Sequence, residues 1–135
     1  FKAKGDANSV GDIAYMRAAE MFLIEAEALA RNDQEAASKL VFTTFMKTRV
    51  PTYVSSSASG SAYLTEIMNS RRVELWGEGF TIYDLKRLNQ ALNRNGSNHN
   101  SALAVSMDVA AGDAQWQWLI PQSEINANPL VKQND

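Results

Sequence analysis

Two glutamates four residues apart, Glu74 and Glu78, are the residues of this chain whose spacing could most readily support chemistry. A glycoside hydrolase needs two carboxylates that face one sugar bond, roughly 5 to 10 Å apart. Carboxylates held by neighbouring guanidinium groups have lowered pKa values and are poor proton donors, and such groups also occur in purely structural ion pairs. Because arginines surround this pair in the sequence, we interpret it as structural. A glycoside hydrolase that uses Glu74 and Glu78 is the less favoured alternative.

The arginines near these glutamates could bind them. On a helix over residues 62–77, Arg71 would share a stripe with Leu64, Met68 and Leu75, because steps of three or four residues return to one side. An arginine can bind a carboxylate through two parallel hydrogen bonds while its stem lies on apolar surface. Two glutamates four residues apart repel each other on a helix, so a cation is expected between them. The nearest candidates are Arg71, Arg72 and Arg87.

Charged residues nearer the start of the chain have the same mixed surroundings. Arg17, Glu20 and Glu27 lie among apolar residues, and we interpret them as pairing between helices, with a ligand clamp as the alternative. The predicted structural ion-pair network consists of Arg17, Glu20, Glu27, Arg71, Arg72, Glu74, Glu78, Asp84 and Arg87. No residue is assigned a catalytic role, and we do not expect an enzyme.

The sequence supports neither a metal site nor a cofactor. His99 is the only histidine and cysteine is absent, so a zinc site or a Ser-His triad would lack parts. Gly77 and Gly79 do not have the spacing of a phosphate-binding loop. We therefore expect no cofactor.

Aromatic residues are the expected tools of a glycan receptor, because their faces stack on the C–H faces of sugar rings. Tyr53 and Tyr63 flank a serine-rich loop and are the candidate ligand-binding residues. Core packing or burial is the preferred interpretation of the other large aromatics, which are Trp76, Phe80, Tyr83, Trp116 and Trp118.

The bulk properties of the chain exclude some classes of partner. With 135 residues it is long enough for one ordinary domain with a real core. The formal net charge of -2 gives no electrostatic reason to expect a nucleic-acid partner. No stretch approaches the ~20 apolar residues of a membrane-spanning helix, and Phe1 opens no signal peptide.

The elements that must position these residues are mainly helices. Residues 1–12 are expected to be a lead-in loop ending in Asp12 as a helix cap, followed by an antiparallel hairpin over about 13–50. After the loop 51–62, a second hairpin over about 62–93 is expected to bend at the glycines. Residues 94–135 are expected to be irregular, with a short helical or extended piece at 102–107, an extended QWQWLIP segment and one helical turn capped by Ser123.

Three segments in this order resemble one known family. Residues 69–89, NSRRVELWGEGFTIYDLKRLN, resemble the signature E-R-R-x-E-L-x-x-E-G-H-R-x-x-D-L-K-R of the SusD/RagB family, the nutrient-binding lipoproteins of the outer membrane of Bacteroidetes. They depart from it at Ser70, Phe80 and Thr81. Residues 15–31 resemble the family's M-R-Y-A-E-x-x-L-I-x-A-E-A helix, and residues 118–135 resemble its W-x-I-P-x-x-E-I-x-x-N-P-x-x-x-Q-N ending.

The resemblance implies a mainly α fold of tetratricopeptide-like antiparallel hairpins with long irregular loops, forming the C-terminal part of a longer SusD-like protein. It implies non-catalytic binding of a glycan or other nutrient at the cell surface and delivery to a partner TonB-dependent transporter. The lipid anchor of such a protein would lie outside this chain, and most glycan contacts would come from other regions. A helical-repeat scaffold for protein–protein interaction is the alternative function.

Overall fold

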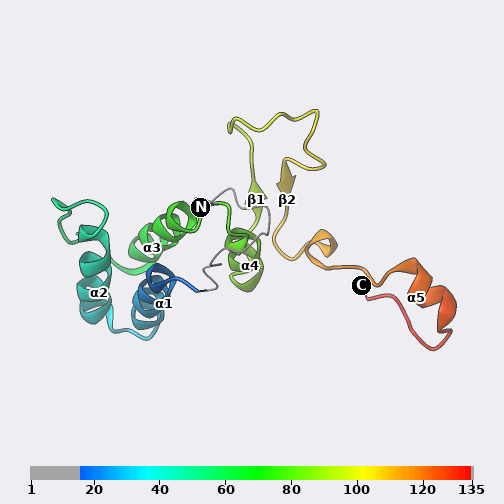
Figure 1. The fold of residues 1–135 in the computed structure, drawn as a ribbon, viewed down its shortest axis with the longest axis horizontal. Coiled ribbons are helices and arrows are strands. Elements are labelled where there is room, and N and C mark those ends of the chain that lie inside the picture. Colours follow the sequence, from blue (N-terminus) through cyan, green and yellow to red (C-terminus); the bar gives the residue numbers. More distant parts are fainter. Residues whose placement is uncertain (1–15, 135) are drawn as a thin grey trace, which may run out of the picture. The chain divides into compact units, whose positions relative to one another are not determined.

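The computed structural model describes residues 16–134, so the predicted lead-in loop and the Asp12 cap lie outside the described residues. The described residues form two compact units, which are divided between residues 76 and 77. Within the described part, helices dominate and the strands are very short, which confirms the mainly α prediction (Figure 1). Among these residues, no helix is both long and apolar enough to cross a bilayer.

The described part of the first unit contains three helices, α1 (Ala18–Arg31), α2 (Glu35–Lys47) and α3 (Gly60–Glu74). Both α2 and α3 pack on α1. Asp33, with a φ of 57°, turns the chain between α1 and α2, and the N–H of Gln34 donates to the carbonyl of Leu29 at 2.9 Å. A turn of this length makes α1 and α2 antiparallel neighbours.

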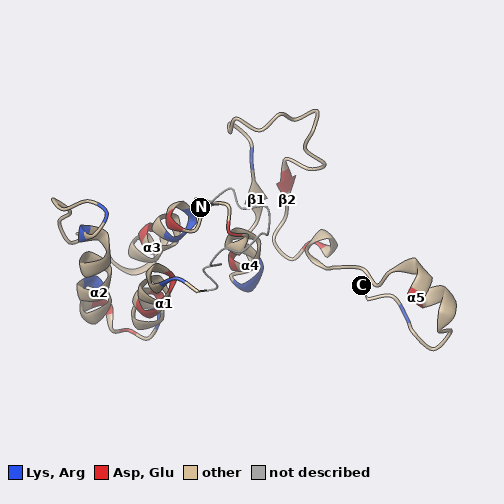
Figure 2. Cartoon of the chain, in the orientation of Figure 1, with Lys and Arg blue, Asp and Glu red and all other residues tan. Residues whose placement is uncertain are grey.

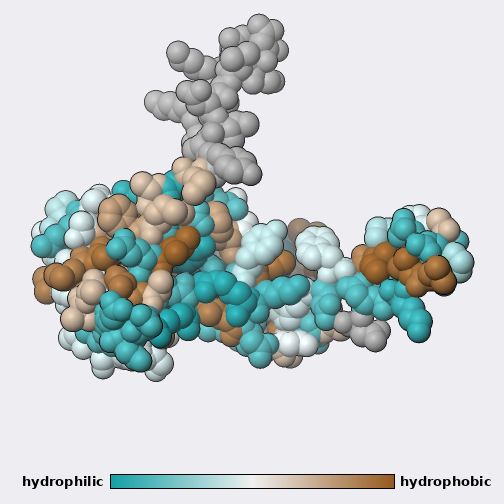
Figure 3. Space-filling model, turned by 90° about the horizontal axis from the view of Figure 1, so that it is seen from below, coloured by the Kyte–Doolittle hydropathy of each residue, from teal (hydrophilic) through white to brown (hydrophobic). Residues whose placement is uncertain are grey.

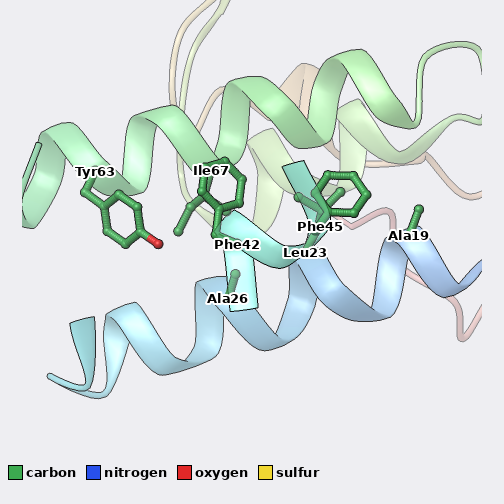
Figure 4. Packing of buried hydrophobic residues seen from close by; sticks show 7 residues of the cluster. All are labelled: Ala19, Leu23, Ala26, Phe42, Phe45, Tyr63 and Ile67. Carbon is green, nitrogen blue, oxygen red and sulfur yellow. The ribbon is translucent and has the colours of Figure 1, made fainter. Parts of the chain in front are cut away.

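The core of this unit lies where the three helices meet (Figure 4). Its buried apolar members are Ala19, Leu23, Ala26, Phe42, Phe45, Tyr63 and Ile67. A polar group is buried with them, because the Ser38 hydroxyl donates to the carbonyl of Ala26 at 2.6 Å and lies 3.0 Å from the Tyr63 hydroxyl. Since Ser38 gives its single hydrogen to Ala26, Tyr63 is the donor in the second bond.

The second unit begins at Gly77, with the glycine break. Gly77 and Gly79 adopt φ values of 79° and 84°, which residues other than glycine rarely adopt. Helix α4 (Phe80–Arg87) follows, and the prediction that this helix continues to residue 93 is wrong. Asn89, with a φ of 49°, ends it, and the strand β1 (Leu92–Asn93) then pairs antiparallel with β2 (Asp108–Val109).

The last part of the chain is held together largely by side chains. A 3₁₀ turn, η1 (Ala114–Trp116), interrupts the predicted extended segment, and α5 (Gln122–Ala127) begins one residue before Ser123, so the cap position belongs to Pro121. The predicted piece at 102–107 forms neither a helix nor a strand, and the ordered pairing comes just after it in β2.

The C-terminal tail folds back on the segment before α5. Gln133 pairs with Ile120 in both directions: its amide oxygen accepts from the backbone N–H at 2.8 Å and its amide nitrogen donates to the carbonyl at 3.0 Å. The Asn134 amide nitrogen donates to the carbonyl of Trp118 at 2.9 Å. These contacts give the end of the chain a defined course although it forms no regular element after α5.

Candidate functional site

Glu74 is the centre of an ion-pair cluster in the first unit. Arg49 holds it through two parallel hydrogen bonds, from Nε to Oε2 at 2.8 Å and from Nη2 to Oε1 at 2.7 Å. Arg17 also donates to Oε1, and to the backbone carbonyl of Glu74 at 3.2 Å. Arg17 precedes α1, Arg49 follows α2 and Glu74 ends α3, so one carboxylate connects an end of each helix.

This arrangement fixes the protonation state of Glu74. The hydrogen bonds from Arg49, together with the charges of Arg49 and Arg17, hold the pKa of Glu74 below its ordinary value of 4.5 against an opposing effect of burial. The same contact raises the pKa of Arg49. A carboxylate so held is a poor general acid, because it stays ionised where a catalytic donor must carry a proton.

Other members of the predicted network form one ion pair between helices and two ion pairs within single helices. Arg71 on α3 reaches Glu20 on α1, with Nη2 3.5 Å from Oε1, and both side chains are largely buried. Two pairs lie within single helices, Glu27 with Arg31 at 2.7 Å and Asp84 with Arg87 at 2.9 Å. Arg72 and Glu78 are exposed. Figure 2 shows that charges of both signs follow α1, α2 and α3.

The cations on Glu74 are not the ones expected from the sequence. Arg71, Arg72 and Arg87 were the nearest candidates, whereas Arg17 and Arg49 bind the carboxylate. Arg49 lies 25 residues away in the chain and no pattern in its own segment points to Glu74. Its place at the end of a predicted helix, two residues before Pro51, is the one available signal, since basic residues favour helix C-termini.

The structure corrects the placement of the candidate ligand-binding tyrosines. Tyr63 is fully buried on α3, so its ring is not an exposed loop aromatic. Tyr53 is half-buried, and its hydroxyl donates to Oε1 of Glu66 at 2.7 Å, while Ser56 donates to Oε2 of the same carboxylate. Burial and the contact with Glu66 raise the pKa of Tyr53. The serine-rich loop is therefore tied to α3 through Glu66.

The expected burial of three other aromatics is also wrong. Trp76, Tyr83 and Trp118 are 85%, 66% and 82% exposed. Burial of Trp76 and Tyr83 was expected for one continuous helix, whereas the chain breaks between α3 and α4. The turn η1 likewise interrupts the alternation on which the expected burial of Trp118 depended. Figure 3 shows further apolar surface on the part of the chain around α5.

Each unit contains a hollow of ligand size. In the first unit, a mostly apolar groove of about 350 Å³ lies between the C-terminal turns of α2 and α3. Phe45, Met46, Val50 and Val73 line it, and the Arg49–Glu74 pair forms part of its wall. In the second unit, a hollow of about 340 Å³ lies between the end of α4 and the segment 112–117.

The polar lining of the second hollow distinguishes it from the groove. Its lining includes three residues with amide side chains, Asn89, Gln90 and Gln117, together with Lys86 and Trp116. Within residues 16–134 no group of three or more His, Cys, Asp or Glu side chains could hold a metal ion. His99, whose Nδ1 lies 2.8 Å from the Ser97 hydroxyl, is in an exposed loop.

Comparisons with known proteins agree with this fold. The model of the SusD family matches residues 2–135. A crystal structure of a candidate sugar binding protein from Bacteroides vulgatus ATCC 8482 has a similar fold, with a TM-score of 0.79 and 24% sequence identity; the match covers 97% of this chain and 30% of that one. This chain therefore corresponds to less than a third of the length of that protein. Among curated proteins, no sequence matches the chain.

Proposed function

We propose a function from the premise that this chain belongs to the SusD family, whose model matches it over residues 2–135. The proposed function is non-catalytic binding of a glycan or oligosaccharide at the bacterial cell surface. The bound nutrient would pass to a TonB-dependent outer-membrane transporter, and the receptor would be an outer-membrane lipoprotein. The family match, which runs over nearly all the chain, is the observation that carries this proposal.

Two further observations support it. The similar crystal structure is described as that of a candidate sugar binding protein, and it shares the fold of this chain. In this chain, Glu74, one of the two carboxylates of the alternative hydrolase, is engaged by two arginines. Binding without turnover is the function that fits both.

A glycan array tests the proposal directly. The full-length protein is expected to bind one class of oligosaccharide, and it is expected to release no product from chromogenic glycosides of the same sugars. Glu74→Gln serves as the internal control for hydrolysis, because it removes the charge but keeps the shape. Turnover by the unmodified protein that disappears in this variant would support the glycoside hydrolase instead.

Delivery to a transporter needs a separate test. Crosslinking in intact outer membranes should join the protein to a TonB-dependent transporter, and deletion of that transporter should stop uptake of the bound sugar without changing its binding. Crosslinking to no such transporter would leave the receptor role standing and remove the delivery role.

The apolar groove between α2 and α3 favours one second candidate, a helical-repeat scaffold that binds a protein partner. Val50 and Val73 line this groove and are 46% and 78% exposed. Under this alternative, the full-length protein would bind no glycan, and a charge introduced by Val73→Glu would abolish capture of the partner.

A further inference from the structure

The hollow in the second unit is assembled from two segments that the short β ladder brings together. Helix α4 leads directly into β1, and β2 leads directly into residues 110–117. Leu92 pairs with Val109, and Arg94 donates its backbone N–H to the carbonyl of Met107 at 2.8 Å. The end of α4 is therefore placed opposite the segment that contains Gly112 and Trp116.

The way α4 ends places Asn89 and Gln90 in the lining of the hollow. The N–H of Gln90 donates to the carbonyl of Leu85 at 2.8 Å, and that of Asn89 donates to the carbonyl of Lys86 at 3.1 Å. This is the Schellman arrangement, with Asn89 in the left-handed position that glycine usually takes. Glycine would close this helix as well, but it would bring no amide to the hollow.

The opposite wall is held by hydrogen bonds that engage the polar edge of the Trp116 ring and not its faces. The Trp116 indole nitrogen donates to the carbonyl of Ala110 at 2.7 Å, so the polar edge of the ring is already satisfied. Asp113 caps the 3₁₀ turn through its side chain, which accepts from the N–H of Gln115 at 2.8 Å. Gly112 has a φ of 72°, and a Cβ there would lie 3.6 Å from the Asn89 amide oxygen.

The lining combines the two kinds of contact that a sugar ring requires. A half-buried indole offers an apolar surface for C–H groups, and amide side chains both donate to and accept from hydroxyls. The volume of about 340 Å³ lies at the lower end of the range for small-molecule sites, which suits a short ligand. Lys86 is the one charged residue in the described lining, and its ammonium can donate to ring hydroxyls.

We propose that this hollow is a saccharide subsite that binds one neutral sugar residue, with Trp116 as the stacking surface and Asn89, Gln90 and Gln117 as the hydroxyl-binding groups. The inference rests on the proposed function and adds a location to it. It predicts that this C-terminal region contacts the glycan itself, whereas the family resemblance implies that most contacts lie elsewhere.

Nuclear magnetic resonance on the full chain tests the subsite. The probes are D-glucose, D-galactose, D-mannose and N-acetylglucosamine, each titrated into isotope-labelled protein. At least one sugar is expected to shift the Gly112 amide, the Trp116 indole N–H and the side-chain amides of Asn89 and Gln117 with one dissociation constant.

Two variants and a matched control decide whether the lining binds the sugar. Asn89→Gly keeps the left-handed helix end and removes one amide, and Gln117→Ala removes another. Each should raise the dissociation constant about fivefold, which corresponds to about 1 kcal/mol for one lost hydrogen bond. Asn98→Gly removes an exposed amide from the loop outside the hollow and should change nothing.

Three outcomes would overturn the subsite. These are shifts confined to residues outside the hollow, unchanged affinity in both lining variants, and no shift with any sugar of the panel. A glycan array on the full-length protein separates this failure from failure of the proposed function. If the array shows binding that Asn89→Gly and Gln117→Ala leave unchanged, the receptor stands and the subsite falls; if it shows none, the receptor falls too.

Discussion

Arg71 and Arg72 are adjacent on α3, and their different burial predicts very different effects of the same substitution. Arg71 is 6% exposed and its Nη2 lies 3.5 Å from Oε1 of Glu20, whose side chain is 14% exposed. Arg72 is exposed. Arg71→Ala would leave Glu20 as a largely buried charge without this cation, whereas Arg72→Ala removes only a surface side chain.

The expected cost follows from the burial of Glu20. Breaking a buried ion pair by removing one partner costs about 3 to 5 kcal/mol. Because of the 3.5 Å separation and the residual exposure of Glu20, we expect Arg71→Ala to lower the free energy of unfolding by about 3 kcal/mol. For a chain of this size, that loss lowers the melting temperature by about 10 °C. Arg72→Ala should stay within about 0.5 kcal/mol of the unmodified chain.

Urea unfolding followed by far-ultraviolet circular dichroism measures both variants under the same conditions. In this experiment, the free energy of unfolding falls linearly with urea concentration. If Arg71→Ala lowers the urea midpoint but leaves the slope of that line unchanged, the substitution acts on stability and not on the compactness of the unfolded chain. The reasoning is refuted if the two variants unfold at the same urea concentration. A double variant with Glu20→Ala adds a second check, because removing both charges should recover part of the loss.

Three further predictions concern other contacts of the chain. The pKa of Glu74 is lowered in the folded state, so the stability that its ion pairs contribute is present above about pH 4.5 and is lost as the pH falls through the pKa of the folded state. Glu74→Gln should therefore flatten the acid side of the curve of stability against pH. Tyr63→Phe removes the hydroxyl that lies 3.0 Å from the Ser38 hydroxyl, and calorimetry should show a loss of about 1 kcal/mol. Asn89→Val should cost about 1 to 2 kcal/mol in urea unfolding, because a β-branched residue is strained at a φ of 49°, whereas Asn89→Gly should cost less.

The helices of the first unit could be predicted because their signals are local. Apolar residues at steps of three and four mark α1 and α2, and Asn32 and Asp33 mark the turn between them. The end of α4 was missed because its stop signal is an asparagine and not a glycine. Asn89 enters the left-handed region only with the support of the bonds from Gln90 and Asn89 to the preceding turn.

The candidate site was harder to predict because its contacts join distant parts of the chain. Helical spacing relates Glu74 only to residues of its own helix, so it suggested Arg71 and could not suggest Arg49 or Arg17. The sequence indicates a loop position for Tyr63, because its pattern predicts a helix that starts only one residue before Tyr63. The helix in fact begins at Gly60, so Tyr63 lies within its first turns and faces the core.

The C-terminal motif shows how a sequence pattern can report a tertiary contact without revealing it. Trp118 and Ile120 belong to neither strand, so no sheet ladder supplies partners for their backbone groups. Gln133 and Asn134 supply those partners across spacings of 13 and 16 residues. Neither spacing corresponds to a helix or strand period, so the motif can be matched to a family but not interpreted physically from the sequence alone. The W-x-I-P and Q-N parts of the motif are therefore two sides of one contact, and a change at Gln133 should act on the segment around Ile120.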